Sequence, residues 1–347
     1  MSEPASAPLQ PPSSTVTAGG WVRRVLLLAL AVAVAVAVLR ILGAIAWEQV
    51  WAALGQLSWW HPLVLVVLLL LRQVLNASPL AFYISGISLY RATLNDLGAS
   101  TMAAVAPPPG DIALRVAMFT SWGVHPSRAM AGAVMNSLTF FIVRFGAPLP
   151  GFVLLVIAGQ QPGLRLLDVL SLLISAAILG GILLTVRTST WASVLGHGAA
   201  RVVRRVRPSV QPAAWARTCE AFRDDIAATF DTGFPRAVLA TCAMVTTDLL
   251  VLTLCLRFVG VSAQEVTVLQ VAVAFLFAYP LTLFPMQGAG VVDAVVLASL
   301  VEAAGSGVVE PAVAAMVIWR VFTIAGPFLL GLGAVYTWRR TTSSSGR

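Results

Sequence analysis

Charged side chains stand inside segments of this sequence that are otherwise apolar. They are four arginines and three aspartates: Arg72, Arg115, Arg144, Arg320, Asp111, Asp248 and Asp293. A planar guanidinium group can hold a phosphate through two parallel hydrogen bonds. A carboxyl group that is removed from water has a raised pKa and can exchange a proton near neutral pH. The pattern predicts an anion-binding site formed by the arginines, with aspartates that either couple proton movement or pair with the arginines.

Two breaks that contain proline and glycine interrupt the apolar runs. They are "APPPGDIALR" (Ala106–Arg115) and "LFPMQGAGVVD" (Leu283–Asp293). Proline ends an incoming helix because it lacks a backbone donor, and glycine lets the chain turn with positive φ. The next half-helix then begins with free N–H groups and the positive end of its dipole, which together favour an anion. The residues expected to form these turns are Pro109, Gly110, Pro285, Gly288 and Gly290.

The composition places both breaks in a membrane. Hydrophobic residues make up 59% of the 347 residues and charged residues 10%, whereas soluble proteins carry about 25% charged residues. Unwound backbone at membrane depth is tolerated where it faces protein or water, so the breaks predict a polar cavity with a surplus of positive charge. The net charge of +8 fits basic cytoplasmic loops better than a nucleic-acid surface.

Seven segments have the length and apolarity of membrane helices, which need roughly 20 residues to cross the bilayer. They are Val25–Trp47, Trp60–Ile84, Ala129–Ala158, Leu166–Val186, Pro235–Phe258, Val266–Phe284 and Ala312–Trp338. The connection 187–234 carries seven arginines and the tail after Trp338 carries three, whereas 48–60 and 259–265 carry none. Because arginine is enriched in cytoplasmic loops, both termini are expected in the cytoplasm.

Cytoplasmic termini require an even number of crossings. That number results if the segments around the two breaks, Thr93–Trp122 and Val266–Gly305, each enter and leave on the same side. The fold class expected is therefore an all-α polytopic membrane protein with about six full spans and two re-entrant hairpins. Residues 1–24 and 339–347 are expected to be cytoplasmic tails, the first one disordered, on either side of a transmembrane domain at 25–338.

An internal repeat supports this arrangement. A shift of 176 residues places Pro109 on Pro285, Arg144 on Arg320 and Arg72 on Asp248. Repeat one is expected at 25–158 and repeat two at 166–338, with the arginine-rich loop 187–234 inserted. Inverted repeats with broken helices near the bilayer midplane are typical of transporters. Chance similarity between apolar segments is the alternative explanation.

Several of these features have a purely structural interpretation. Arg72 and Asp248 could pair with each other across the repeat axis. Asp111 and Arg115 are four residues apart and could stabilise a helix as an i,i+4 pair. In the loop 187–234, apolar residues recur at helical spacing from Trp215 to Phe230, which predicts either a helix lying on the membrane surface or one packed on neighbouring loops.

The motifs resemble those of the flippase-like family named for the transmembrane region of lysylphosphatidylglycerol synthase. The resemblance rests on "PPPGDIALR" (Pro107–Arg115), "PMQGAGVVD" (Pro285–Asp293) and "IWRVF" (Ile318–Phe322), in order over roughly 25–338. The family pattern has glutamate where this chain has Asp111 and Asp293, and Arg115 comes one residue late. The resemblance implies handling of an anionic or aminoacylated phospholipid or a polyprenyl-phosphate carrier. Nine residues follow Trp338, so the aminoacyl-transferase domain of bifunctional relatives is not implied.

The function expected is that of a lipid flippase of the cell membrane, with Arg72, Arg115, Arg144 and Arg320 as substrate-binding residues. A proton-coupled transporter of small solutes and a non-catalytic structural or regulatory subunit are the alternatives. An enzyme is not expected because no GxSxG, HExxH or DxD stretch is present. No metal or cofactor is expected, and the partners expected are the membrane and a lipid substrate, without nucleic acid.

Overall fold

The computed structural model describes residues 47–55, 57–105, 110–157, 166–187 and 212–344. Every regular element in these ranges is a helix: α2 (Trp47–Leu54), α3 (Trp60–Tyr83), α4 (Leu89–Val105), α5 (Gly110–Ser121), α6 (Pro126–Gly146), α7 (Pro148–Ile157), α8 (Leu166–Arg187), α10 (Pro212–Phe258), α11 (Val268–Ala278), η1 (Tyr279–Leu283), α12 (Pro285–Gly288), α13 (Val291–Ala304), η2 (Ser306–Val308), α14 (Val309–Arg320), η3 (Val321–Ala325) and α15 (Gly326–Ser344). The expected tail 1–24, helix Val25–Trp47 and turn residue Pro109 lie wholly or almost wholly outside the described residues.

Five helical stretches are long and apolar enough to cross a membrane. They are Trp60–Tyr83, Pro126–Ile157, Gly233–Phe258, Met286–Ala304 and Ser306–Thr342. Their mean hydropathy lies between 1.4 and 2.1, which reflects side chains that lack the polar groups needed to face water. The expectation of an all-helical membrane protein is confirmed at this level.

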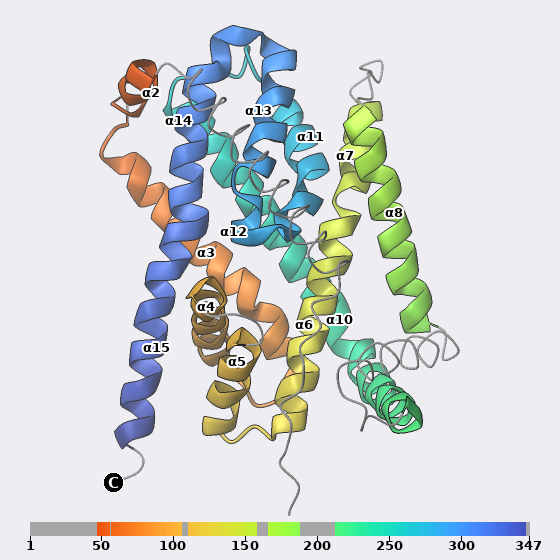
Figure 1. Cartoon of the computed structure of the whole chain (residues 1–347). Coiled ribbons are helices and arrows are strands. Elements are labelled where there is room, and N and C mark those ends of the chain that lie inside the picture. Colours follow the sequence, from red (N-terminus) through yellow and green to blue (C-terminus); the bar gives the residue numbers. More distant parts are fainter. Residues whose placement is uncertain (1–46, 56, 106–109, 158–165, 188–211, 345–347) are drawn as a thin grey trace, which may run out of the picture. The chain divides into compact units, whose positions relative to one another are not determined.

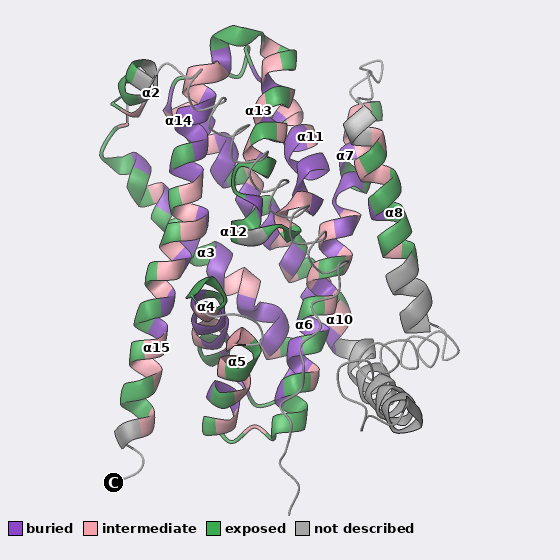
Figure 2. Ribbon diagram, viewed as in Figure 1, coloured by how far each residue is buried: buried purple, intermediate pink, exposed green. Residues whose placement is uncertain are grey.

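Helices α3 and α10 form the centre of the structure. They pack against each other, and α10 also contacts α6, α14 and α11. Figure 2 shows burial concentrated where these helices face their neighbours, whereas the part of α8 whose burial is described, 169–180, is mostly exposed. The exposed face of α3 carries Leu63, Val67 and Leu70. Apolar side chains on the outside of a helical bundle suit lipid rather than water.

Each central helix is followed along the chain by a pair of shorter helices that pack on each other. After α3 come α4 and α5, and after α10 come α11 and α13, joined through η1 and α12. Figure 1 places α4 and α5 in the lower half of the helical group and α11 and α13 in the upper half, with α12 at mid-height. Alone, the 14 residues of α13 are about 21 Å long at 1.5 Å per residue, which is less than the roughly 30 Å of a hydrocarbon core. The stretch Met286–Ala304 reaches the length of a crossing only with the turn residues 286–290.

Proline interrupts the two helices that follow these pairs. Pro148 starts α7 directly after α6, which ends at Gly146. The second interruption is a π-helical turn, Val321–Ala325, between α14 and α15. Pro327 is the second residue of α15, and its ring cannot be accommodated against the carbonyl of a regular preceding turn, so the helix widens there. The expected helices Ala129–Ala158 and Ala312–Trp338 lie within the helical stretches Pro126–Ile157 and Ser306–Thr342. The first stretch is divided at Ala147 before Pro148, and the second contains the π-helical turn.

Helix α10 is longer than the sequence indicated. Its expected start at Pro235 lies inside a helix that begins at Pro212. The stretch from Trp215 to Phe230 is helical as expected, but it continues into the apolar segment instead of forming a separate helix. A proline inside a helix removes one backbone hydrogen bond and can kink a helix without ending it, which explains the difference.

Exposed charges separate by sign between the two ends of the structure. Glu48 lies on α2, Glu265 in the turn between α10 and α11, and Glu302 on α13 before η2, which are elements at the upper end in Figure 1. Arginines occupy the other end, where Arg128 lies at the start of α6 and the guanidinium group of Arg91 lies 5.7 Å from the ring of Trp122. Among the described residues, exposed acidic side chains thus lie toward the upper end of the helical group and exposed arginines toward the lower end.

Close packing of α4 on α15 yields the first testable prediction. A Cβ at Gly331 would overlap the hydroxyl of Thr101 and the carbonyl of Leu97, whereas a Cβ at Gly333 would meet nothing within 4 Å. We expect Gly331→Ala to destabilise the protein by roughly 1–3 kcal/mol through overpacking. Gly333→Ala should be neutral or slightly stabilising. Thermal unfolding in detergent measures both, and equal melting temperatures for the two variants would contradict the packing described.

Candidate functional site

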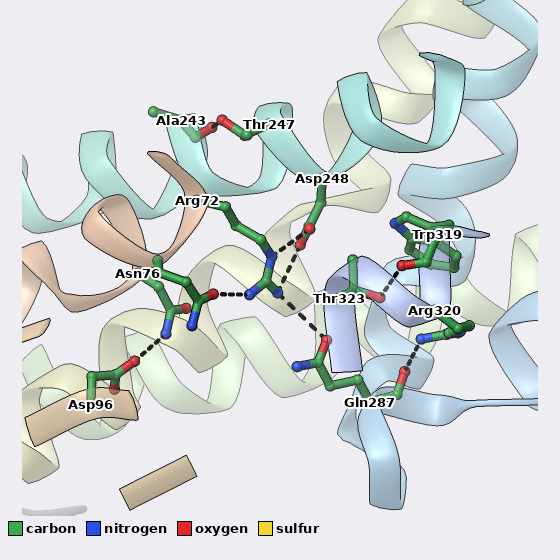
Figure 3. Close-up of polar contacts among 11 residues, drawn as sticks. Arg72, Asn76, Asp96, Ala243, Thr247, Asp248, Gln287, Trp319, Arg320 and Thr323 are labelled. Carbon is green, nitrogen blue, oxygen red and sulfur yellow. Dashed lines mark hydrogen bonds and ion pairs between the residues drawn. The ribbon is translucent and has the colours of Figure 1, made fainter. Parts of the chain in front are cut away.

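The first expected site arginine, Arg72, is paired with Asp248. Nε of Arg72 lies 2.5 Å from Oδ1 of Asp248, and Nη2 lies 3.1 Å from Oδ2. Both side chains are buried, with 6% and 4% of each residue exposed. Nη1 of Arg72 donates to Oε1 of Gln73 at 2.7 Å. Arg72 and Asp248 thus pair with each other, which is the structural alternative that the sequence offered for them. The pair joins α3 to α10 (Figure 3).

Arg115 also has a carboxylate partner, but it is Asp96 and not Asp111. Nη2 of Arg115 lies 3.0 Å from Oδ1 of Asp96, and Nη1 donates to Oδ1 of Asn95 at 3.1 Å. Nδ2 of Asn95 donates in return to the Arg115 carbonyl at 2.9 Å. The i,i+4 pairing with Asp111 is therefore wrong, because α4 packs beside α5 and brings a buried carboxylate across. An exposed i,i+4 pair stabilises a helix by a few tenths of a kcal/mol, which is too little to compete.

Asp96 is the site residue that sequence reasoning missed. It lies in α4, 4% exposed, and accepts a second hydrogen bond from Nδ2 of Asn76 on α3. Asn76 follows Arg72 by one helical turn, so the two ion pairs approach the same stretch of α3 (Figure 3). The signal in the sequence was the pair "ND" at Asn95-Asp96 inside an apolar helix, which needs an internal partner to be buried.

The third pair joins Arg320 to Asp293 at the second break. Nε of Arg320 lies 2.9 Å from Oδ1 and 3.1 Å from Oδ2 of Asp293. Nη1 donates to the backbone carbonyl of Gln287 at 3.3 Å, and the guanidinium lies over the ring of Trp319 at 4.2 Å. Oδ2 of Asp293 accepts from the backbone N–H of Gly290 at 2.7 Å. The carboxylate thereby caps the start of α13 and neutralises the arginine at once.

The second break contains residues with positive φ, and not all of them are glycines. Gly288 and Gly290 have φ of +68° and +83°, as expected for turn residues, and a Cβ at Gly288 would lie 2.5 Å from the Leu281 carbonyl. Met286 and Gln287 also have positive φ, 55° and 54°. A left-handed conformation costs a residue with a side chain roughly 1–2 kcal/mol, so this turn is strained. At the first break, Gly110 begins α5.

Arg144 differs from the other three arginines. Its Nε is buried and has no hydrogen-bond partner among the described residues. No carboxylate lies within ion-pair distance of it in the described part of the chain, although the Tyr279 phenol is close enough to interact electrostatically. The surplus of positive charge expected for the site amounts to one among the described residues, because Asp96, Asp248 and Asp293 each neutralise one of the four arginines. The uncompensated charge is local to Arg144.

Comparison with family models, with curated proteins and with solved structures finds no match to this chain. The flippase-like resemblance therefore stays a prediction that rests on the motif residues.

The Arg72–Asp248 pair gives a second prediction. Asp248→Asn removes the counter-charge and leaves a buried guanidinium, which should lower the free energy of unfolding by about 3–5 kcal/mol. The double variant Arg72→Met with Asp248→Leu removes both charges and should recover most of that loss, because apolar residues of similar volume replace buried ion pairs well. Chemical denaturation in detergent measures both variants. A double variant as unstable as Asp248→Asn alone would show that the charge balance is not what matters.

The strained turn gives a third prediction. Met286 is exposed, with 58% of the residue accessible, so Met286→Gly removes strain while losing little packing. We expect its melting temperature to match or exceed that of the wild type. Ala298→Gly is the matched control, since it lies exposed inside α13 and should cost about 1 kcal/mol through lower helix propensity. If both glycine variants lose stability equally, residue 286 is not left-handed in solution.

Proposed function

We propose that this chain is a multi-pass transporter of the cell membrane that translocates or handles an anionic lipid. The substrate is an anionic or aminoacylated phospholipid or a polyprenyl-phosphate-linked lipid, and Arg144 binds its charged group. The observation that carries the proposal is the uncompensated guanidinium of Arg144, beside three other arginines that all have carboxylate partners.

A charge without a partner in an apolar helix is costly. Insertion of arginine near the middle of a membrane helix costs about 2.5–3.5 kcal/mol, and such residues are most often functional. An anionic ligand supplies the counter-charge that the described residues do not. The guanidinium fork of arginine matches the oxygen atoms of a phosphate, which favours a phosphate-bearing head group as that ligand.

The pairing of Arg72 with Asp248 supports two related halves. These residues are 176 positions apart, which is the repeat offset found in the sequence. Residues equivalent under a two-fold operation contact each other where they lie on the axis. The described helices also recur in the same order, α3 to α7 and then α10 to α15, and each half has an interruption soon after its matched arginine, Arg144 or Arg320. We therefore propose an inverted repeat with its axis between α3 and α10.

Helix lengths and charges suggest how the halves lie in the bilayer. The α4–α5 and α11–α13 pairs lie toward opposite ends of the helical group (Figure 1), and α5 and α13 contain 12 and 14 residues. Half-helices of this length suit re-entrant hairpins that stop near the midplane. The end with Arg91 and Arg128 is placed in the cytoplasm, since arginine marks that side.

Transport is proposed rather than catalysis. Asp96, Asp248 and Asp293 each bind a guanidinium group, so each of these carboxylates already has a structural partner. The repeat also explains why Arg144 has no carboxylate partner in the described part of the chain. The position 176 residues before Asp293 is Ala117, so the first half lacks the carboxylate that neutralises Arg320 in the second.

A lipid-accessibility assay tests the proposal. The protein is reconstituted into phosphatidylcholine vesicles that contain fluorescent phosphatidylglycerol, and a membrane-impermeant reductant reports the rate at which labelled lipid reaches the outer leaflet. We expect Arg144→Ala to slow this rate at least tenfold, because a hydrogen bond to a charged group contributes about 1.5–3 kcal/mol. Arg144→Lys should lose less, since it keeps the charge.

Arg128→Ala is the matched control, because Arg128 lies exposed at the start of the same helix, and it should keep the wild-type rate. A wild-type protein that does not accelerate exchange, or an Arg144→Ala variant that equals the wild type, would overturn the proposal. A parallel arm with vesicles that enclose glycerol phosphate distinguishes a lipid carrier from a transporter of small soluble phosphates.

A further inference from the structure

One residue in the second break contacts two separate ion pairs. Oε1 of Gln287 accepts from Nη2 of Arg72 at 3.5 Å, and the backbone carbonyl of Gln287 accepts from Nη1 of Arg320 at 3.3 Å. Asp248 and Asp293 hold the same two arginines from other helices. Figure 3 shows Gln287 lying between the two guanidinium groups. Among the described residues, no other side chain or carbonyl is bonded to both.

The contact with Arg320 depends on the left-handed turn. In a continuous α-helix the carbonyl of residue 287 would accept from the N–H of residue 291, and the N–H of residue 290 would donate to the carbonyl of residue 286. Arg320 would then lose the Gln287 carbonyl as a hydrogen-bond acceptor. The carboxylate of Asp293 would likewise lose the hydrogen bond that it now accepts from the N–H of Gly290. The broken and the straight forms of this segment therefore differ in named hydrogen bonds.

The turn also has the features of an element with two arrangements. Met286 and Gln287 are the residues other than glycine that have positive φ in the described chain, so the broken form is strained. Nη2 of Arg320 and Nε1 of Trp319 are buried without a partner, so the broken form does not satisfy every donor around it. A π-helical turn begins directly after Arg320, and such turns are frequent at functional sites.

We propose that residues 285–290 form a two-state coupling element in which Gln287 links the Arg72–Asp248 and Arg320–Asp293 pairs. While both arginines hold Gln287, the segment stays broken. When either arginine withdraws, the segment straightens and extends α13 toward its N-terminus. The link transmits a change between α3 and α14, elements that carry the two halves of the structure. It is a property of the fold and does not depend on the proposed function.

Hydrogen exchange gives a direct test of the two states. In the broken form the N–H groups of Val291 and Val292 begin α13 and have no helical partner, because the first N–H groups of a helix cannot have one. The charge-balanced variant Arg72→Met with Asp248→Leu removes the side-chain link without burying a lone charge. We expect exchange at residues 291 and 292 to slow about tenfold, because straightening supplies carbonyl partners (a 1.4 kcal/mol shift is a factor of ten).

The same comparison in a Gln287→Gly background isolates the link. Glycine keeps the left-handed turn without strain and has no side chain to bond Arg72, so the Arg72→Met, Asp248→Leu change should now leave exchange at residues 291 and 292 unaltered. Unchanged exchange in the wild-type background, or an equal change in both backgrounds, would overturn the proposal.

Melting temperatures give a second measurement that does not depend on local exchange. One variant replaces both the Arg72–Asp248 pair and the Arg320–Asp293 pair by Met and Leu. Its loss of melting temperature should be several degrees smaller than the sum of the losses measured when each pair is replaced alone. In the Gln287→Gly background the losses should add. Additive losses in the wild-type background would contradict the coupling.

The Arg115–Asp96 pair is the matched control. It is bonded to α3 through Asn76 but makes no hydrogen bond with Gln287. Replacing it by Met and Leu should therefore add to the loss from the Arg320–Asp293 replacement in every background. Non-additive losses for this control pair would show that any two buried pairs couple, and would overturn the specific role of Gln287.

Discussion

Compensation of buried charge is the constraint on which this structure depends. A guanidinium group taken out of water loses a hydration energy that is far larger than the stability of a folded domain, so it must gain a counter-charge and hydrogen bonds in return. Arg72 meets this requirement with Asp248 and Gln73. Because the two charged residues come from α3 and α10, the requirement also fixes the relative depth and rotation of the two helices that form the centre.

At the second break, the unwound backbone and the charged side chains form hydrogen bonds that satisfy each other. Unwinding a helix leaves N–H and carbonyl groups without partners, which is costly where no water reaches them. Here the carboxylate of Asp293 accepts from Gly290, and the guanidinium of Arg320 donates to Gln287. The same two side chains neutralise each other. The break is thus maintained by ionised groups that also require the break for their own hydrogen bonds.

The two segments related by the 176-residue offset differ in their balance of charge. Arg320 has Asp293 within 2.9 Å, whereas Ala117 stands 176 residues before Asp293, the same offset that separates Arg144 from Arg320. Asp96, on α4, neutralises Arg115 instead of Arg144. Among the described residues of this set, Arg144 alone has no carboxylate partner, and on that residue the proposed binding of an anion rests.

The sequence by itself determined the class of the protein and the positions of its breaks. Apolar segments such as Trp60–Tyr83 have no stable place in water, and Pro285 with Gly288 and Gly290 interrupts a helix wherever it lies, so composition and local backbone chemistry suffice for these features. The four arginines of the candidate site and two of their three acids, Asp248 and Asp293, could be named for the same reason, since charge within an apolar run is visible in the sequence. Asp96 was missed. The tertiary structure alone decided which acid each arginine meets. Asp96 reaches Arg115, and Gln287 reaches both Arg72 and Arg320, because packing brings together helices that are far apart along the chain, and no spacing within one segment encodes that contact.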